Sequence, residues 1–553
     1  METLKEKLSL SYLAKNKPIV LVFLSAFLLI GAFPPSPLAF LSYIGFIPLF
    51  YLMEYRNKIF GYCYFLLLFW NIGVGYWLGM TALGVDPDER FGAALSGILA
   101  NTLNPLLMYL PIWAYNAGRK RLIAKGLYEK FQFLYPFSFV CFWITFEWLH
   151  LNWDLSWSWL TLGHCMTFYP KAIQYLEITG IFGVSAYILI LNVAFFLLLK
   201  FRNLYPEKIK MGIAAVGVFL ILPYLSNLYL LNPNRAVFQV NGTLNVRLIQ
   251  PNIDPFGKLS GSKREQIANF SDLIDDPGID TIDMALLPET AIPTYVFPET
   301  MRENEWVKPL WALVDSHPRL SIVTGIFEIK NYPPASQNVP PSASKCREGF
   351  CMGHYDVFNA AAVMRKNKPV QTVEKGKLVP MVERMPFLQY LAPILGDFVV
   401  AVGGTMGGYG LPTEIHPLNV NDKAKLGSMI CYESEYGDYV RELTQKGANF
   451  MSIITNDGWW QKSSGHIQHA YFTTLRAIEN RREVVRSANT GISLFSDNQG
   501  NLHQLTEYWT RCKIDRKVKL YEAQTFYVTY GDYLAWICAI LALGTMIWIR
   551  VKR

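Results

Sequence analysis

Long apolar blocks follow one another through the first 231 residues, and a further block lies near the C-terminus. A membrane-spanning helix needs roughly 20 apolar residues, because each residue adds about 1.5 Å across the hydrocarbon core. Only 17% of the 553 residues are charged, and the mean hydropathy is +0.19. This composition is too apolar for an ordinary soluble enzyme. We therefore predict a polytopic α-helical membrane protein with about eight spans: 19–34, 36–53, 60–83, 92–117, 132–150, 177–200, 210–231 and 532–549.

The first two blocks are short, and Pro34-Pro35-Ser36-Pro37 separates them. They could form a tilted or re-entrant pair. Lys15 and Lys17 precede the first block, which could also be a cleaved signal peptide. No clear small-residue cleavage site follows it, so we favour a retained span. The predicted N-terminal membrane domain covers residues 1–231 with about seven transmembrane helices, and residues 532–553 form a last helix and a cytoplasmic tail.

Basic residues are concentrated in alternate loops and at both ends of the chain. The basic loops carry Lys5, Lys7, Lys15, Lys17, Arg56, Lys58, Arg119, Lys120, Arg121, Lys125, Lys200, Arg202, Lys208, Lys210, Arg550, Lys552 and Arg553. The intervening loops are acidic or nearly uncharged. By the positive-inside rule both termini are cytoplasmic, and the segment from about 232 to 530 lies on the outer side. The net charge of +8 therefore reflects membrane topology, and nucleic-acid binding is not expected.

Residues 243–525 have a different pattern, with short β-rich runs separated by turn residues and helix-like stretches. The helix-like segments include 434–447 and 466–482. Alternation of this kind indicates an α/β domain with layered sheets. The expected strands are 244–250, 284–288, 321–328, 356–364, 426–431, 450–455, 484–488 and 492–496.

Three residues in this region could form a nucleophilic site. Glu289 and Cys431 each end a short apolar strand, and Lys375 is followed eight residues later by Glu383. A thiol must lose its proton to attack a carbonyl, and a nearby carboxylate can accept that proton. A lysine ammonium can lower the thiol pKa and stabilise an oxyanion. Each residue also has an ordinary interpretation, as a buried cysteine, a solvated glutamate or a surface lysine. The spacing of these residues alone does not decide between the catalytic and the ordinary interpretation.

The motifs around these residues resemble those of the nitrilase, or carbon–nitrogen hydrolase, superfamily. PETAIP surrounds Glu289, K-x-x-LVP-x-x-E-x-x-P runs from Lys375 to Pro386, and ICYE contains Cys431. NDGWW, His469, RAIE and RSANTG follow. Together with FEWL, SWLTLGH and EITGIFGVS in the apolar part, the chain resembles the apolipoprotein N-acyltransferase family over nearly its whole length. That resemblance implies a nitrilase-like αββα sandwich over residues 243–525.

The resemblance also implies roles for individual residues. Glu289 would be the general base, Lys375 the oxyanion stabiliser and Cys431 the nucleophile, with Glu383 and Glu433 in supporting positions. The implied reaction takes an acyl chain from a membrane phospholipid and passes it to the α-amine of a diacylglyceryl apolipoprotein. It needs no metal and no diffusible cofactor. The implied location is the bacterial inner membrane, with the catalytic domain in the periplasm.

Some features depart from the family or stay open. Where the family often carries a tryptophan after the first strand, this chain has Phe256 and Leu259, so an aromatic substrate contact there is in doubt. Cys346 and Cys351 lie in a polar loop and could form a local disulfide. The apolar, glycine-rich stretch 387–410 could be a mobile flap that dips into the bilayer, or an ordinary core segment. The tryptophans Trp148, Trp153, Trp157 and Trp159 could anchor the protein at the interface or contact substrate.

Two other functions are compatible with parts of the chain. A membrane-tethered amidase or lipid hydrolase would pass through the same acyl-enzyme, but a hydrolase of small amides has no need of eight spans. A receptor or transporter with a degenerate nitrilase-like domain should have lost part of the Glu-Lys-Cys set, and all three residues are present here. The sequence therefore favours the acyltransferase.

Overall fold

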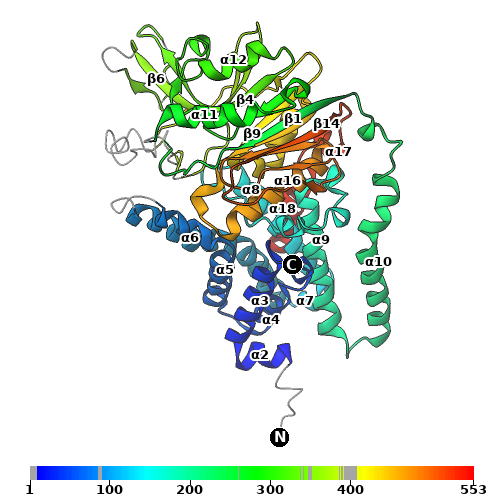
Figure 1. The fold of residues 1–553 in the computed structure, drawn as a ribbon. Helices are drawn as coiled ribbons and strands as arrows, with labels where there is room; N and C mark the ends of the chain where they lie inside the picture. The colour runs from blue at the N-terminus through cyan, green and yellow to red at the C-terminus, as the bar shows by residue number, and fades with distance from the viewer. Residues whose placement is uncertain are drawn as a thin grey trace.

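A computed structural model describes residues 9–84, 90–258, 261–336, 338–340, 342–346, 351–380, 382–384, 386–387, 390 and 408–552. An α/β part lies above a bundle of helices, and the last helix returns from the α/β part into the bundle (Figure 1). The stretch 387–410 falls almost entirely outside the described residues, so the flap hypothesis stays a prediction.

The bundle contains helices of very different length. Its elements are α2 (Leu10–Asn16), α3 (Pro18–Ala32), η1 (Ala39–Tyr43), α4 (Ile47–Tyr55), α5 (Phe60–Gly75), η2 (Tyr76–Leu83), α6 (Arg90–Ala124), α7 (Tyr128–Phe131), η3 (Tyr135–Phe137), α8 (Ser138–Leu151), η4 (Leu162–Met166), η5 (Pro170–Ala172), α9 (Leu176–Phe201), α10 (Pro206–Leu230), η6 (Ala236–Phe238) and α18 (Tyr533–Val551).

Among the described residues, five helical stretches have the length and apolar character needed to cross a membrane. They are Phe60–Leu83, Ala93–Ala124, Leu176–Phe201, Pro206–Leu230 and Tyr533–Val551. The remaining predicted spans correspond to shorter helices, α3 with 15 residues, α4 with 9 and α8 with 14. The helical membrane part is thus confirmed, whereas the count of eight spans stays a prediction.

The α/β part contains two β-sheets. Its strands are β1 (Gly242–Gln250), β2 (Met284–Leu286), β3 (Tyr295–Val296), β4 (Ser321–Tyr332), β5 (Ser344–Lys345), β6 (His354–Met364), β7 (Gln371–Glu374), β8 (Leu418–Asn419), β9 (Lys425–Ile430), β10 (Phe450–Thr455), β11 (Val484–Ala488), β12 (Leu494–Ser496), β13 (Leu502–His503) and β14 (Cys512–Leu520). One sheet has the order β14-β1-β2-β4-β6-β5, with β3 beside β4 and β7 beside β6; the other has the order β13-β12-β11-β10-β9-β8.

Helices cover the outer faces of the two sheets. They are α11 (Lys263–Ile274), α12 (Lys308–Ser316), α15 (Gly437–Gln445) and α16 (Ser464–Asn480), with η7 (Ile279–Thr281), η8 (Pro298–Thr300), η9 (Cys431–Glu435), η10 (Asp457–Trp460) and α17 (Phe526–Tyr530) in the connections.

Alternation along the strands shows how the layers stack. Leu248 packs between the sheets together with Ile430, whereas the next residue, Ile249, packs against α11 and α12. Met429 turns to the other side and joins the cluster under α15. Because successive side chains of a strand point to opposite faces, each sheet has one face on its partner and one on a helix layer. The predicted αββα sandwich is therefore confirmed.

The helix layer of the second sheet rests on the membrane bundle. In α16, Gln468 accepts hydrogen bonds from the indoles of Trp77 at 3.1 Å and Trp159 at 2.6 Å, and it donates to the carbonyl of Pro34 at 2.7 Å. At the end of α16, Arg481 donates to the side chain of Gln174 at 2.7 Å. These buried polar contacts join segments about 300 residues or more apart in the sequence and fix the sandwich on the bundle.

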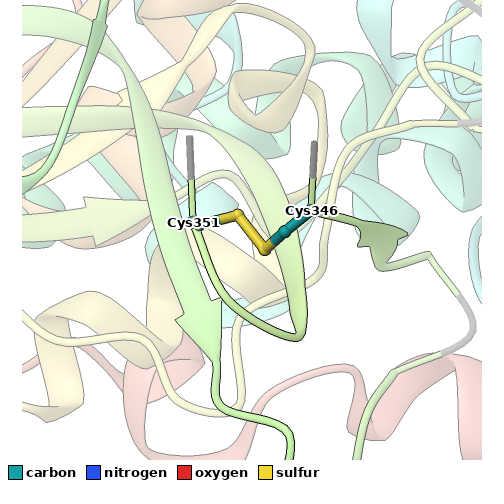
Figure 2. Close-up of a disulfide and its surroundings, with 2 residues drawn as sticks. All are labelled: Cys346 and Cys351. Carbon is teal, nitrogen blue, oxygen red and sulfur yellow. A yellow bond between two sulfur atoms is a disulfide. The ribbon is translucent and has the colours of Figure 1, made fainter. Parts of the chain in front are cut away.

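A disulfide joins Cys346 to Cys351 beside the start of β6, as Figure 2 shows. The sequence had left this pairing open. The other cysteines that the structure describes are free thiols, and Cys431 is one of them.

Candidate active site

The three predicted reactive residues lie at the ends of different strands. Glu289 follows β2, Lys375 follows β7 directly, and Cys431 follows β9 directly. β7 is held on β6 in an antiparallel ladder, and the amide of Lys375 extends this pairing by donating to the carbonyl of Asn359 at 2.7 Å. Strand ends are rigid supports for loops, which is why reactive side chains are often found there.

Lys375 joins two carboxylates inside the sandwich. Its Nζ lies 3.1 Å from Oε1 of Glu289 and 2.8 Å from Oε1 of Glu383, and its side chain is only 1% exposed. Burial lowers the pKa of Lys375, but the negative charges of Glu289 and Glu383 outweigh this effect and hold it well above the ordinary value. The side chain is therefore a permanent cation in a site that excludes most water.

The thiol of Cys431 is close enough to Glu289 and Lys375 for both charges to act on its ionisation. Burial raises the pKa of Cys431 far above its usual range; Glu289 raises it further, and Lys375 opposes the rise. The thiol is thus neutral at pH 7 and needs a base in order to react. The residue as a whole retains some exposure to solvent.

The backbone at Cys431 is unusual. Its φ angle is 53°, in the left-handed region that a residue with a Cβ atom rarely occupies. The residue begins η9, which turns the chain sharply between β9 and α15. Strained backbone of this kind persists only where its surroundings enforce it, and it is frequent at active sites.

Hydrogen bonds to the side chain of Glu433 help to hold the backbone at Cys431 in this conformation. Its Oε2 accepts the amide of Ile430 at 2.7 Å, and its Oε1 accepts the amides of Gly376 at 2.6 Å and Lys377 at 3.3 Å. Burial raises the pKa of Glu433 to about 7, and the amides of Ile430 and Gly376 are among the groups that oppose the rise. Glu433 therefore joins the cysteine turn to the lysine turn.

Two residues that the sequence did not single out also contact Glu289. Asn359, in β6, donates its amide to Oε1 of Glu289 at 2.8 Å. Lys258 is 4% exposed and donates to the carbonyl of Glu289 at 2.9 Å and to the hydroxyl of Thr290 at 3.0 Å. Thr290 has a φ of 47°, so Lys258 stabilises a strained turn directly after the carboxylate. A polar residue inside an apolar strand was the one available signal for Asn359.

His469, named from its motif, lies beneath the cysteine turn. Its Nδ1 is 2.9 Å from Asp457, whose other oxygen accepts a hydrogen bond from Arg486 at 2.7 Å. Burial raises the pKa of Asp457, but Arg486 and His469 outweigh this and hold it well below its usual range. The guanidinium of Arg486 also lies 3.0 Å from Nδ1 of His469. The hydroxyl of Ser434 donates to the carbonyl of Cys431 at 2.9 Å, and its oxygen lies 3.1 Å from Nε2 of His469.

A cavity of about 340 Å³ opens beside these turns. Gly376 and Lys377 line it from the lysine turn, Tyr439 lines it from α15, and Phe182 lines it from the membrane helix α9. Open space therefore lies at the junction between the sandwich and the bundle, next to the lysine turn; Glu289, Lys375 and Cys431 are not among its lining residues. Among the described residues, no group of three or more histidine, cysteine, aspartate or glutamate side chains is arranged to hold a metal ion.

Together, the helical membrane bundle and the αββα sandwich define a membrane-bound protein of the carbon–nitrogen hydrolase class. The family model for carbon-nitrogen hydrolase matches residues 245–515, and that for the apolipoprotein N-acyltransferase N-terminal domain matches residues 25–194. The chain belongs to the apolipoprotein N-acyltransferase family.

Curated relatives match over nearly the full length. The apolipoprotein N-acyltransferase of Chlorobaculum tepidum is 27% identical over 540 residues, which cover 95% of each chain. That of Geobacter metallireducens is 26% identical over 532 residues, covering 95% of this chain and 93% of the relative. Among solved structures, a carbon-nitrogen hydrolase from Helicobacter pylori superposes on 56% of this chain and 96% of its own, with 13% identity and a TM-score of 0.35.

Proposed function

We propose that the protein transfers a fatty acyl chain from a membrane phospholipid to the α-amino group of the N-terminal diacylglyceryl-cysteine of apolipoproteins. The observation that carries this proposal is the buried Lys375 ammonium, held between Glu289 and Glu383 beside the Cys431 thiol. The substrates come from the names of the relatives and from the membrane bundle, since a lipid acyl donor needs an enzyme that lies in its bilayer.

In the proposed first half-reaction, Glu289 accepts the thiol proton of Cys431 as the sulfur attacks the ester carbonyl. Both Asn359 and Lys375 donate to Oε1 of Glu289, which leaves Oε2 for the proton. The tetrahedral oxyanion is stabilised by the ammonium of Lys375. The C–O bond then breaks, Glu289 returns the proton to the leaving alkoxide, and a lysophospholipid departs from an S-acyl enzyme.

The second half-reaction uses the same groups in reverse. The α-amine of the diacylglyceryl-cysteine attacks the thioester carbonyl, and Glu289 takes a proton from the nitrogen. The C–S bond breaks, the thiolate receives that proton, and an amide is released. No redox change occurs and no diffusible cofactor is consumed. Glu383 keeps Lys375 in place through its 2.8 Å contact, and Glu433 fixes the backbone on both sides of the site.

The proposed arrangement in the cell follows the charge pattern of the loops. Residues 1–231 and 532–553 form the membrane domain in the bacterial inner membrane, with both termini in the cytoplasm, and residues 243–525 form the catalytic domain in the periplasm. The catalytic site then faces the compartment through which lipoprotein precursors pass. A disulfide at Cys346–Cys351 is compatible with an oxidising compartment.

The alternative of a membrane-tethered amidase or lipid hydrolase is not favoured, because the relatives with nearly full coverage carry the acyltransferase name. The two functions share the thioester and differ in what removes it. Water would release a free fatty acid, whereas a lipopeptide amine would become acylated.

The deciding experiment is a two-stage acylation assay. The full-length protein in mild detergent is mixed with phosphatidylethanolamine, and intact-protein mass spectrometry is used to search for a hydroxylamine-labile acyl adduct on Cys431. A synthetic diacylglyceryl lipopeptide is then added. Transfer of the adduct to the peptide amine is expected. Loss of the adduct to water alone would favour the hydrolase, and a folded protein that never acylates Cys431 would overturn the proposed nucleophile. An N-acetylated lipopeptide is the matched control and should remain unmodified.

A further inference from the structure

A second cavity, of about 800 Å³, lies in the membrane bundle at the end remote from the catalytic domain. It is formed where α5 begins, next to the C-terminal half of α6. The other end of α5 runs into η2, where Trp77 packs on Trp460 of the sandwich with ring centroids 4.7 Å apart. The volume is typical of cavities that hold a small molecule. The length of α5 therefore separates this second cavity from the catalytic domain.

Most of the lining is apolar and is open to the surrounding lipid. Phe60 and Phe65 of α5, Trp113 of α6 and Ile19 of α3 all line the cavity, and each is about half exposed. Their exposed faces belong to the surface that the bundle presents to the bilayer. An occupant that enters from the side would thus place hydrocarbon against these side chains.

The charged side chains of the lining are both positive. Lys58 and Lys120 line the cavity, and no aspartate or glutamate is among its lining residues that the structure describes. Lys120 donates to the carbonyl of Asn57 at 2.7 Å, which fixes its ammonium at this place and leaves two N–H donors. Two ammonium groups above an apolar groove are complementary to a phosphodiester attached to acyl chains.

Asn116 provides an independent indication of a ligand. It lines the same cavity and is 5% exposed, yet its Oδ1 accepts no hydrogen bond from any described residue. An unsatisfied buried acceptor is costly, so a partner with a hydroxyl or N–H donor would be favoured at this position. Asn116 and Lys120 lie one helical turn apart on α6, so one ligand can reach both.

We infer that this second cavity binds one anionic glycerophospholipid, with its phosphodiester on Lys58 and Lys120, a headgroup hydroxyl on Asn116 and an acyl chain along Phe60 and Trp113. The positive-inside pattern places this lipid in the cytoplasmic leaflet, across the membrane from the proposed acyl transfer. Its binding requires none of the residues of the candidate active site.

The test is a lipid titration of the full-length protein followed by native mass spectrometry. Phosphatidylglycerol should bind as one retained copy, more tightly than phosphatidylcholine of the same acyl chains. In the double variant Lys58→Gln/Lys120→Gln, affinity for phosphatidylglycerol should fall by about thirtyfold, as expected for the loss of two charges next to an anionic headgroup. The exposed Lys130→Gln variant is the matched charge control and should bind as the parent does.

An occlusion variant tests the cavity without changing any charge. A Cβ atom added at Gly61, which lines the cavity, would meet no other atom within 4 Å, so Gly61→Phe adds a ring at the cavity wall with no clash at its Cβ atom. Gly217→Phe on α10 is the matched control, because a Cβ atom there also meets nothing within 4 Å. Loss of the retained lipid in Gly61→Phe alone supports the inference. Equal binding of both lipids, or unchanged binding in the charge and occlusion variants, would identify ordinary annular lipid and overturn it.

Discussion

The backbone amide of Gly376 donates to Oε1 of Glu433 over 2.6 Å, so the residue after Lys375 is fixed by the residue two positions after Cys431. The second oxygen of Glu433 holds the amide of Ile430, just before the cysteine. A single carboxylate thus joins the backbone of the lysine turn to that of the cysteine turn.

The first prediction concerns this carboxylate. Glu433→Gln has one carbonyl oxygen in place of two, so the amide of Ile430 or that of Gly376 must face an NH₂ group. We expect a stability loss of about 1–3 kcal/mol, the usual cost of an unsatisfied buried donor, together with slower acylation of Cys431. Thermal unfolding in detergent and the rate of adduct formation measure the two effects. A stable variant that acylates at the parental rate would contradict the proposed coupling of the two turns.

The second prediction concerns the charge of Lys375. Lys375→Met leaves Glu289 and Glu383 facing each other without the ammonium between them, and it removes the proposed oxyanion donor. Both acylation and transfer should slow by about a hundredfold or more, as when an oxyanion donor is lost elsewhere. Single-turnover assays with phospholipid and then lipopeptide separate the two steps. Lys368→Met, in an exposed turn, is the control for loss of a lysine charge.

Much of the fold was accessible from the sequence, because buried parallel strands read as continuous apolar runs between turn residues. Phe450–Thr455 was predicted with the observed ends, and so was Val484–Ala488, although Arg486 and Ser487 interrupt its apolar run. The block 132–150 was less well predicted: its first residues form turns and a short 3₁₀ element, and α8 begins only at Ser138. Hydropathy does not distinguish an apolar turn from the first turn of a helix.

The candidate site was accessible only in part. Glu289, Lys375 and Cys431 were selected by motif, and the structure brings them together, although their catalytic roles stay predictions. Asn359 and Lys258 were not foreseen, since neither a strand amide nor a loop lysine has a local pattern that reveals a distant partner. Their contacts with Glu289 span 70 and 31 residues and arise only when the sheets assemble.

The third prediction is the pH dependence of thiol alkylation. Because burial raises the pKa of Cys431, the neutral thiol is favoured in the folded protein, and the reactive thiolate increases as the pH rises toward that pKa. The rate of modification of Cys431 by iodoacetamide should therefore increase by about tenfold for each pH unit between pH 6 and 9, with no plateau, if the thiolate is the nucleophile. Peptide mass spectrometry measures the rate. A plateau below pH 8 would show a depressed pKa and would contradict the need for a base.

The last prediction concerns the joint between the sandwich and the membrane bundle. Glu177, at the start of α9, binds Arg481 with one oxygen and Arg235 with the other, and both Glu177 and Arg481 are almost fully buried. Glu177→Gln leaves two guanidinium groups without their counter-charge at this interface. Breaking a buried ion pair from one side typically costs about 3–5 kcal/mol, so the thermal unfolding temperature should fall clearly.

The control for this joint is Glu207→Gln in α10, which removes an exposed ion pair with Lys210 whose atoms are 3.0 Å apart. Exposed ion pairs between residues three positions apart in a helix contribute about 0.5 kcal/mol or less to the free energy of unfolding. The control variant should therefore unfold close to the parental temperature. Limited proteolysis gives a second measurement, because a loosened joint should expose the segment after α10 to cleavage in Glu177→Gln only. If both variants unfold at the same temperature and are cleaved alike, the buried pair does not hold the sandwich on the bundle, and the indole contacts of Gln468 must do so instead.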